Sequence, residues 1–344
     1  MSFSVGIVGL PNVGKSTLFK ALTKKQVAIA ARPFTTIHPN LGIVQMPDER
    51  LSKIAEIIKP QKITPTAIEF VDIAGLVKGA HKGEGLGNQF LAEIRNCHAI
   101  LEVVRDFENP EVENVLGELN PEKEIGVIKT ELLMKDLETM DNLLGKLEKE
   151  SKADKQAQKK LEVIKKIKEN VEKEKGVAEI DLTLEEKKEI KEYQFLTAKP
   201  IFYIININGH APVPQLNVRS LVANLKDEEE LSELSAKEAE EFEIKSQLDQ
   251  LIADCYQVLD LITFFTVAGG KETRAWTLKR GLTAPEAGGV VHTDFHDKFI
   301  RAEVVPWDKL VQAQNWHRSR ELGWVKIHGK DYVVQDGDVI EFRI

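Results

Sequence analysis

The chain contains little cysteine and no long apolar run. Two cysteines occur among 344 residues, and no CxxC pair is present. This excludes a disulfide framework and a cysteine-based zinc site, and it is typical of a reducing cytosol. No stretch of about 18 apolar residues exists, so a membrane-spanning helix is not expected. The first ten residues also lack the features of a secretory signal. We therefore expect a cytoplasmic protein with no membrane partner.

Hydrophobic residues make up 42% of the chain and charged residues 30%, which is typical of a globular protein of two or three domains. The net charge of -8 argues against a bulk nucleic-acid binder. However, residues 146–175 hold eleven lysines and seven acids, whereas residues 227–243 hold nine acids and one lysine. The basic segment is either a solvated helix face or a projecting arm that faces RNA phosphates.

Short apolar runs recur along the first two hundred residues, at 3–8, 66–72, 99–104 and 200–206. The segments between the earlier runs have helical patterns. Strands separated by helices predict a mostly parallel sheet that is covered on both faces.

The hydrophobic period changes near residue 130. Apolar residues are spaced four and three apart as far as Leu147, and a second apolar stripe starts at Ala157 after a polar break. This predicts a hairpin of two antiparallel helices, with a plain coiled coil as the alternative. Thr183 followed by Glu186 predicts a capping box at the start of another helix.

After about residue 260, short alternating strands lie between turn-rich sequences, which predicts a compact β-rich domain. We therefore expect an α/β fold with an inserted helical arm and a C-terminal β-rich domain. The expected boundaries are 1–128 and 197–260 for the nucleotide domain, 129–196 for the arm, and 261–344 for the last domain.

The motif GLPNVGKS, residues 9–16, matches GxxxxGK[ST] between an apolar strand and a helical run. Its glycines allow backbone N–H groups to approach phosphates, and the helix N-terminus adds partial positive charge. Lys15 is expected to reach the outer phosphates, and the hydroxyl of Ser16 is expected to ligate Mg²⁺.

Two further pieces follow in the order that a nucleotide switch requires. Asp72 ends an apolar run and begins a DxxG motif that closes at Gly75. We expect Asp72 to hold a magnesium-bound water, and Gly75 to contact the γ-phosphate. Thr36, in PFTTI, is the candidate switch hydroxyl on magnesium.

The strings GLPNVGKSTL, PFTTIHPN and DIAGLVKGAHKGEGLGNQFL resemble the Obg-related GTPases, and specifically the YchF/Obg-like ATPase family. FFTVAGGKETRAWTL, GGVVHTDFHDKFIRAEVV and DYVVQDGDVIEFRI are similar to the TGS domain of that family, a β-grasp module. The resemblance covers nearly the whole chain. It implies a P-loop NTPase domain, a helical arm inserted in it, and ATP hydrolysis in association with ribosomes.

The resemblance leaves the water-positioning residue open. Leu76 stands where many GTPases have the glutamine that orients the attacking water. An apolar side chain cannot bond to water, so slow intrinsic turnover is expected. A histidine in an HVVR-type strand is a candidate catalytic group in the family, and Glu102 occupies that place here. His81 is a second candidate, with a solvated loop residue as the alternative reading.

We expect the site to prefer the base of ATP over that of GTP. The family carries NxxE after the strand at 200–206, whereas this chain has Asn206 and then Gly209 in place of the glutamate. No carboxylate is therefore available there to select guanine. A short SAK-like match begins at Ser235. The expected nucleotide-binding residues are Asn12, Val13, Gly14, Lys15, Ser16, Thr17, Asn206, Ile207, Ser235 and Ala236.

Taken together, the sequence predicts a magnesium-dependent ATPase of low intrinsic rate that acts as a nucleotide-dependent switch in translation or stress response. The expected partner is the ribosome, as the large subunit or the whole 70S or 80S particle, with rRNA or tRNA contacted by the arm and the TGS domain. Two alternatives are an Obg-type GTPase that binds GTP and a ribosome-binding factor in which nucleotide is structural.

Overall fold

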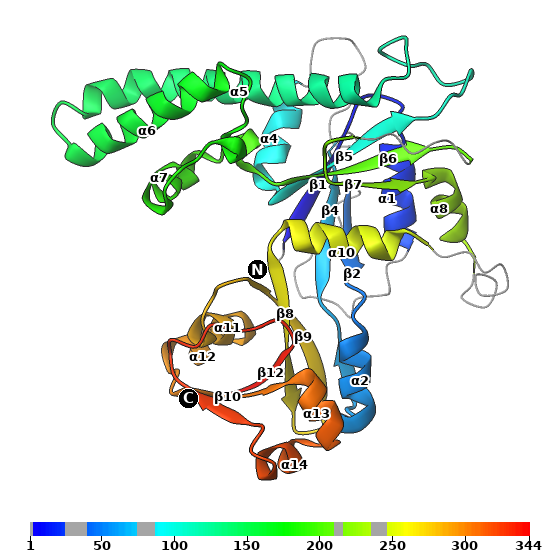
Figure 1. The fold of residues 1–344 in the computed structure, drawn as a ribbon, viewed down its shortest axis with the longest axis vertical. Coiled ribbons are helices and arrows are strands. Elements are labelled where there is room, and N and C mark those ends of the chain that lie inside the picture. Colours follow the sequence, from blue (N-terminus) through cyan, green and yellow to red (C-terminus); the bar gives the residue numbers. More distant parts are fainter. Residues whose placement is uncertain (1–2, 25–39, 74–86, 210–215, 235–245) are drawn as a thin grey trace.

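The computed structural model describes residues 3–24, 40–73, 87–209, 216–234 and 246–344. Figure 1 shows an upper sheet layer from which two long helices project sideways, and a second sheet at the lower end of the molecule.

The first sheet has six strands in the order β2-β4-β1-β5-β6-β7. Every neighbouring pair is parallel except β2 with β4. All five residues of β1 are buried, which explains why this strand reads as a continuous apolar run rather than an alternating one. The strands are β1 (Ser4–Val8), β2 (Leu41–Gln45), β4 (Ala67–Asp72), β5 (Ala99–Asp106), β6 (Ile201–Ile207) and β7 (Ser220–Ala223).

Four helices, together with the first turns of the long helix at 121–150, share one apolar core with this sheet, as the sequence predicted for a parallel α/β domain. They contribute buried residues such as Leu18, Ile94, Leu225 and Leu251. The helices are α1 (Lys15–Lys24), α4 (Asn88–Asn96), α8 (Leu225–Leu231) and α10 (Leu248–Val258).

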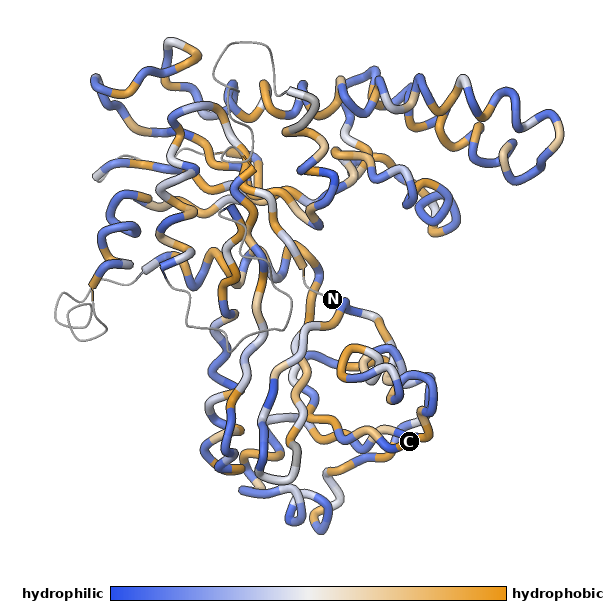
Figure 2. Tube along the Cα trace, turned by 180° about the vertical axis from the view of Figure 1, so that it is seen from behind, coloured by the Kyte–Doolittle hydropathy of each residue, from blue (hydrophilic) through white to orange (hydrophobic). Residues whose placement is uncertain are grey.

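The predicted helical hairpin is present as α5 (Pro121–Glu150) and α6 (Lys155–Val171). It projects from the sheet layer in Figure 1, and its alternating apolar and polar residues are visible along both helices in Figure 2. The capping box of Thr183 and Glu186 is also confirmed, at the start of α7 (Leu184–Ile190). Three short 3₁₀ turns complete the return to β6, namely η1 (Val177–Glu179), η2 (Lys191–Tyr193) and η3 (Leu196–Ala198).

Helix α5 begins at Pro121, before residue 129, where the sequence placed the start of the arm. Asn120 caps the helix by accepting a hydrogen bond from Lys123 N at 3.0 Å, and proline suits the first helical position. Ile128 and Leu132 belong to the core of the first sheet, whereas Leu133 belongs to the core of the arm. The sequence therefore located the change of packing partner, not the start of the helix.

The second sheet has the strand order β11-β10-β12-β8-β9-β3, and all its strands except β3 lie in residues 261–344. Helices cover it through two separate apolar clusters. Its strands are β3 (Lys62–Thr64), β8 (Leu261–Ala268), β9 (Glu272–Lys279), β10 (Arg301–Pro306), β11 (Lys326–His328) and β12 (Asp338–Arg343). Its C-terminal helices are α11 (Ala284–Val291), α12 (Thr293–Asp297), α13 (Trp307–Ala313) and α14 (Trp316–Glu321).

One segment expected in the nucleotide domain packs with the C-terminal domain instead. Helix α2 (Glu49–Ile58) joins the apolar cluster of the second sheet through Leu51 and Ile54, and β3 pairs with β9. Arg50 reinforces the contact with an ion pair to Asp336 at 2.8 Å. The segment 1–128 predicted for the nucleotide domain thus includes a part that packs on the second sheet. The three residues of β3 carry too little local pattern to reveal a distant partner strand.

Among the described residues, no helix combines the length and the apolarity that crossing a bilayer requires.

Candidate nucleotide-binding site

The loop between β1 and α1 adopts a conformation that glycine alone tolerates at two positions. Gly9 has a φ of 145° and Gly14 a φ of 108°. A Cβ at Gly9 would lie 2.4 Å from the carbonyl oxygen of Val103, and one at Gly14 would lie 2.5 Å from Nδ2 of Asn206. The two outer glycines of the motif are therefore required by packing as well as by backbone conformation.

Lys15 lies at the first position of α1 and is 9% exposed. Its Nζ donates a hydrogen bond to the carbonyl oxygen of Leu10 at 2.6 Å, so the amino group folds back over its own loop. Burial lowers the pKa of Lys15 to about 8, against the opposing effect of the negative charges of Asp72 and Glu124. A desolvated cation held against a glycine-rich loop is a suitable partner for phosphate oxygens.

Asn206, at the end of β6, braces the phosphate loop. It is 7% exposed, its Nδ2 donates to the carbonyl oxygen of Val13 at 2.9 Å, and its Oδ1 accepts from Leu225 N at 3.1 Å. The sequence assigned Asn206 to nucleotide binding. In the structure, the side-chain amide of Asn206 is hydrogen-bonded within the protein, where it connects the loop at residue 13 to the start of α8.

Ser16 and Asp72 provide oxygen ligands of the kind that Mg²⁺ prefers. Ser16 is exposed on the first turn of α1, and Asp72 is 5% exposed at the end of β4, paired in register with Ile7. Within the described residues, no group of three or more His, Cys, Asp or Glu side chains could form a metal cage. A hydroxyl and a carboxylate are ligand types that Mg²⁺ commonly combines with phosphate oxygens and water.

Of the other predicted site residues, some are described by the structure and some are not. Asn12 has a left-handed φ of 64°, the side chain of Val13 is buried, Thr17 is half-buried on α1, and Ile207 closes β6. The remainder lie outside the described residues, namely Thr36, Gly75, His81, Ser235 and Ala236.

Sequence reasoning missed the turn that follows β7. Asn224 caps α8 by accepting from Lys226 N at 3.2 Å, and the next residue donates its N–H to Asn206. This turn adjoins the phosphate loop, because a Cβ at Gly14 would lie 3.3 Å from the side chain of Leu225. An Asn before an acidic first turn is a capping signal that could have identified it.

Glu102, the candidate for positioning water, is 2% exposed in β5 and lies opposite Val8 in the register with β1. Burial, and then the negative charge of Glu124, raise the pKa of Glu102 well above its usual value. Glu124 is also 2% exposed, and burial raises its pKa against the opposing effects of Arg105 and Lys15. The protonated form of Glu102 is thereby favoured, and a protonated carboxyl group is a poor general base.

We expect Glu102→Gln to increase thermal stability, and the increase to grow as the pH rises. A carboxyl group whose folded pKa is raised contributes its full stability below the unfolded pKa, and this stability is lost as the pH rises through the folded pKa. Glutamine removes that loss and keeps the shape of a protonated carboxyl group. Melting temperatures of both proteins between pH 5 and pH 9 test this. A difference that shrinks toward alkaline pH would show that Glu102 is stabilised as a carboxylate.

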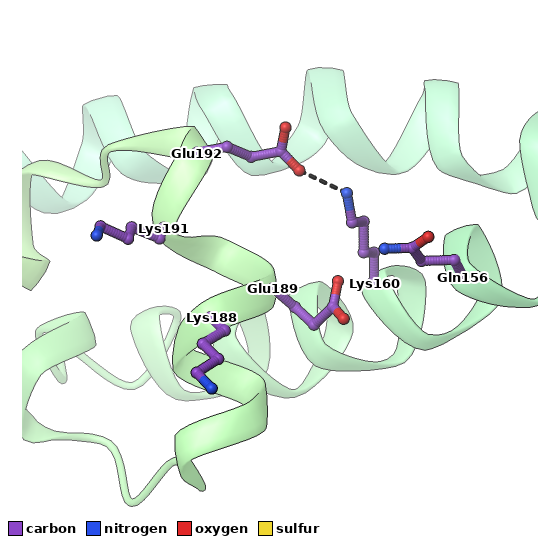
Figure 3. A pocket seen from close by; sticks show the side chains of 6 residues that line it. All are labelled: Gln156, Lys160, Lys188, Glu189, Lys191 and Glu192. Atoms are coloured by element: carbon purple, nitrogen blue, oxygen red, sulfur yellow. Dashed lines mark hydrogen bonds and ion pairs between the residues drawn. The ribbon is translucent and has the colours of Figure 1, made fainter. Parts of the chain in front are cut away.

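Two surface grooves of about 560 Å³ each lie on the arm rather than beside the phosphate loop. In the groove of Figure 3, Lys160 of α6 forms an ion pair with Glu192 at 2.5 Å, whereas the Lys188 and Lys191 side chains point away from that pair. The other groove lies between α4 and α5 and contains an ion pair of Lys135 with Glu138 at 2.5 Å. Both grooves are lined by mixed charges.

A glycine-rich loop between a buried strand and a helix, with a lysine and a hydroxyl at the helix start, defines a P-loop nucleoside triphosphatase. Comparisons with known proteins agree. Residues 4–134 match the family described as "50S ribosome-binding GTPase", and residues 261–344 match the C-terminal domain of YchF-type GTPases, described as "Protein of unknown function (DUF933)".

Full-length relatives specify the family. The chain is 46% identical over 365 aligned residues to "Ribosome-binding ATPase YchF" of Pasteurella multocida, covering 100% of this chain and 99% of that protein. It is 44% identical over 364 residues to the protein of the same name in Bacillus subtilis, with the same coverage. The solved structure of the Schizosaccharomyces pombe YchF GTPase aligns with a TM-score of 0.89 at 32% identity, covering 99% of this chain and 98% of that one. The chain belongs to the YchF family.

Proposed function

We propose that this protein is a ribosome-binding ATPase that hydrolyses ATP to ADP and phosphate as a slow, magnesium-dependent switch. The observation that carries the proposal is the geometry of the phosphate loop. Gly9 and Gly14 occupy conformations closed to other residues, Asn206 braces the loop, and the partly desolvated Lys15 donates a hydrogen bond to the carbonyl oxygen of Leu10 in that loop. The relatives named ribosome-binding ATPases support the activity and the partner.

The proposed chemistry is charge neutralisation and positioning. The amides of residues 12–17 and the Lys15 ammonium hold the phosphates. Ser16 and Thr36, with Asp72 through a water, would hold Mg²⁺, which would supply charge compensation to the phosphoryl group. Gly75 is proposed to contact the γ-phosphate. Leu76 cannot orient the attacking water, and this is the basis for proposing a low intrinsic rate.

ATP is proposed as the preferred nucleotide, with GTP weaker. Gly209 lacks the carboxylate with which guanine-specific sites hold the base, and Asn208 donates its amide N–H to the carbonyl oxygen of Glu108 at 3.1 Å. The competing candidate is GTP hydrolysis, since the Schizosaccharomyces pombe relative is named a GTPase. Ile207, Ser235 and Ala236 are proposed to flank the base in either case.

Calorimetric titration of ATP and GTP side by side, with Mg²⁺ present, decides between the two nucleotides. We expect ATP to bind about tenfold or more tightly, because glycine at position 209 provides no carboxylate to bond the guanine edge. A Kd for GTP equal to or below that for ATP would replace the ATPase assignment with an Obg-type GTPase.

The ribosome, as a large subunit or an assembled particle, is the proposed partner, with rRNA or tRNA meeting the arm and the C-terminal domain in the cytoplasm. The chain itself connects the candidate switch segments to the C-terminal domain. The candidate switch residues fall in the segments 25–39 and 74–86. Strand β2 follows the first segment and β4 precedes the second, and between these two paired strands the chain forms α2, which packs on the second sheet, and β3, which belongs to it. Co-sedimentation with ribosomes in ATP, in ADP and without nucleotide tests the switch. Equal binding in all three states would contradict it.

A further inference from the structure

Arg105 is a buried arginine near the end of β5, 3% exposed, to which neither the sequence motifs nor the phosphate loop assigns a role. Its guanidinium donates to the carbonyl oxygens of Phe107 at 3.0 Å, Val112 at 3.2 Å and Glu113 at 3.3 Å. It also lies 4.4 Å from the ring centroid of Phe107. One side chain thereby fixes the backbone of the loop 107–113.

The loop that Arg105 holds is bonded to two segments of the candidate nucleotide site. Asn12 of the phosphate loop donates its Nδ2 hydrogen to the carbonyl oxygen of Glu113 at 3.3 Å. Asn208, beyond the end of β6, donates in the same way to Glu108 at 3.1 Å. Asn12 has a left-handed backbone in the middle of the phosphate loop, so its side-chain bond restrains a residue whose conformation is intrinsically costly.

The same arginine is tied to the root of the arm. Its backbone N–H donates to Oε2 of Glu124 at 3.0 Å, and Glu124 lies in the first turns of α5. The charge of Glu124 also acts on Lys15. A continuous set of contacts therefore runs from the arm through Arg105 and the loop 107–113 to the phosphate loop.

We propose that Arg105 is a positioning residue for nucleotide binding. It holds the loop 107–113 in the shape that fixes Asn12, and Asn12 in turn keeps the phosphate-loop amides aligned before nucleotide arrives. Prealigned donors bind a ligand more tightly because their ordering cost is already met. The inference rests on the proposed binding of nucleoside triphosphate by residues 9–16.

A double-mutant cycle with Arg105→Lys and Asn12→Gly tests the proposal. Lysine keeps the charge but cannot place donors in a planar fork toward several carbonyls. Glycine allows the left-handed backbone of residue 12 and removes only the side-chain amide. We expect each single variant to raise the Kd for ATP about tenfold, and Arg105→Lys to leave kcat at saturating ATP within about twofold of wild type. The double variant should bind no more weakly than the weaker single variant.

Arg50→Lys is the matched control, because Arg50 is also a partly buried arginine with several partners, in the contact with the C-terminal domain. It should lower the melting temperature and leave the Kd for ATP unchanged. If Arg105→Lys cannot be purified in folded form, Asn12→Gly carries the test alone. It must then both raise the Kd and speed amide hydrogen exchange in residues 107–113.

The outcomes separate this inference from the proposed function. Wild-type protein that binds no ATP would overturn the proposed function. Wild-type protein that binds ATP, together with single variants of unchanged Kd or with additive effects in the double variant, would overturn the role of Arg105 alone. A loss in kcat with an unchanged Kd would also contradict it, because the residue would then act on the chemical step.

Discussion

Lys15→Ala is expected to reduce ATP hydrolysis about 100- to 1,000-fold. The structure places the Lys15 ammonium 2.6 Å from the carbonyl oxygen of Leu10, within the loop whose amides are proposed to hold phosphate. Its charge is the only one that the motif itself contributes toward the outer phosphates, and charge on those oxygens changes most in the transition state. The measurement is single-turnover ATP hydrolysis with Mg²⁺, at protein concentrations above the Kd of each variant.

The pH dependence gives an independent readout of the same lysine. Because the pKa of Lys15 is lowered to about 8 in the nucleotide-free protein, Lys15 loses its proton as the pH rises through that value. Triphosphate binding above pH 8 must then take up a proton, so the Kd for ATP should rise with pH in wild type. Lys15→Arg should flatten this rise, since arginine stays protonated. Hydrolysis by Lys15→Ala equal to wild type would mean that the activity resides elsewhere.

Much of this site was predictable because its information is local. The strand, the glycines, Lys15 and the start of α1 fall within one short stretch of sequence, and each glycine is explained by its own φ or by one close neighbour. The parallel sheet was predictable for a related reason, since strands buried on both faces read as apolar runs. Thr36 and Gly75 were inferred from the same kind of motif and lie outside the described residues.

What the sequence did not reveal depends on contacts between distant residues. Arg105 meets Glu124 across 19 positions, and Asn12 meets Glu113 across 101. No periodicity encodes such pairs. The three residues of β3 are likewise recognisable as a strand only by their pairing with β9, more than two hundred positions away. The helical arm was found by its apolar spacing, but the residue that anchors its return segment was not, because a single aspartate within a charged helix resembles a solvated one.

That anchoring residue is Asp136, and its replacement by alanine is expected to destabilise the arm by about 3–5 kcal/mol. Asp136 is fully buried on α5. Its carboxylate accepts hydrogen bonds from the backbone N–H groups of Leu196 and Thr197 at 2.8 Å each, and from the hydroxyl of Thr197 at 2.7 Å. Alanine would leave these buried donors without a partner. Denaturant unfolding, followed by amide hydrogen exchange at Leu196 and Thr197, measures the loss.

The effect should extend past the site of substitution. Thr197 Oγ1 also accepts the N–H of Val177 at 3.0 Å, so one carboxylate orders two turns of the return segment before the chain enters β6. Asp141→Ala, on the same helix, is the matched control. Asp141 is exposed and paired with Lys168 at 2.6 Å, and exposed ion pairs contribute little to stability. Similar losses in both variants would show that Asp136 acts as an ordinary surface charge. A large loss confined to Asp136→Ala, with exchange accelerated at Val177 as well, would establish it as the buried anchor that joins the arm to the nucleotide domain.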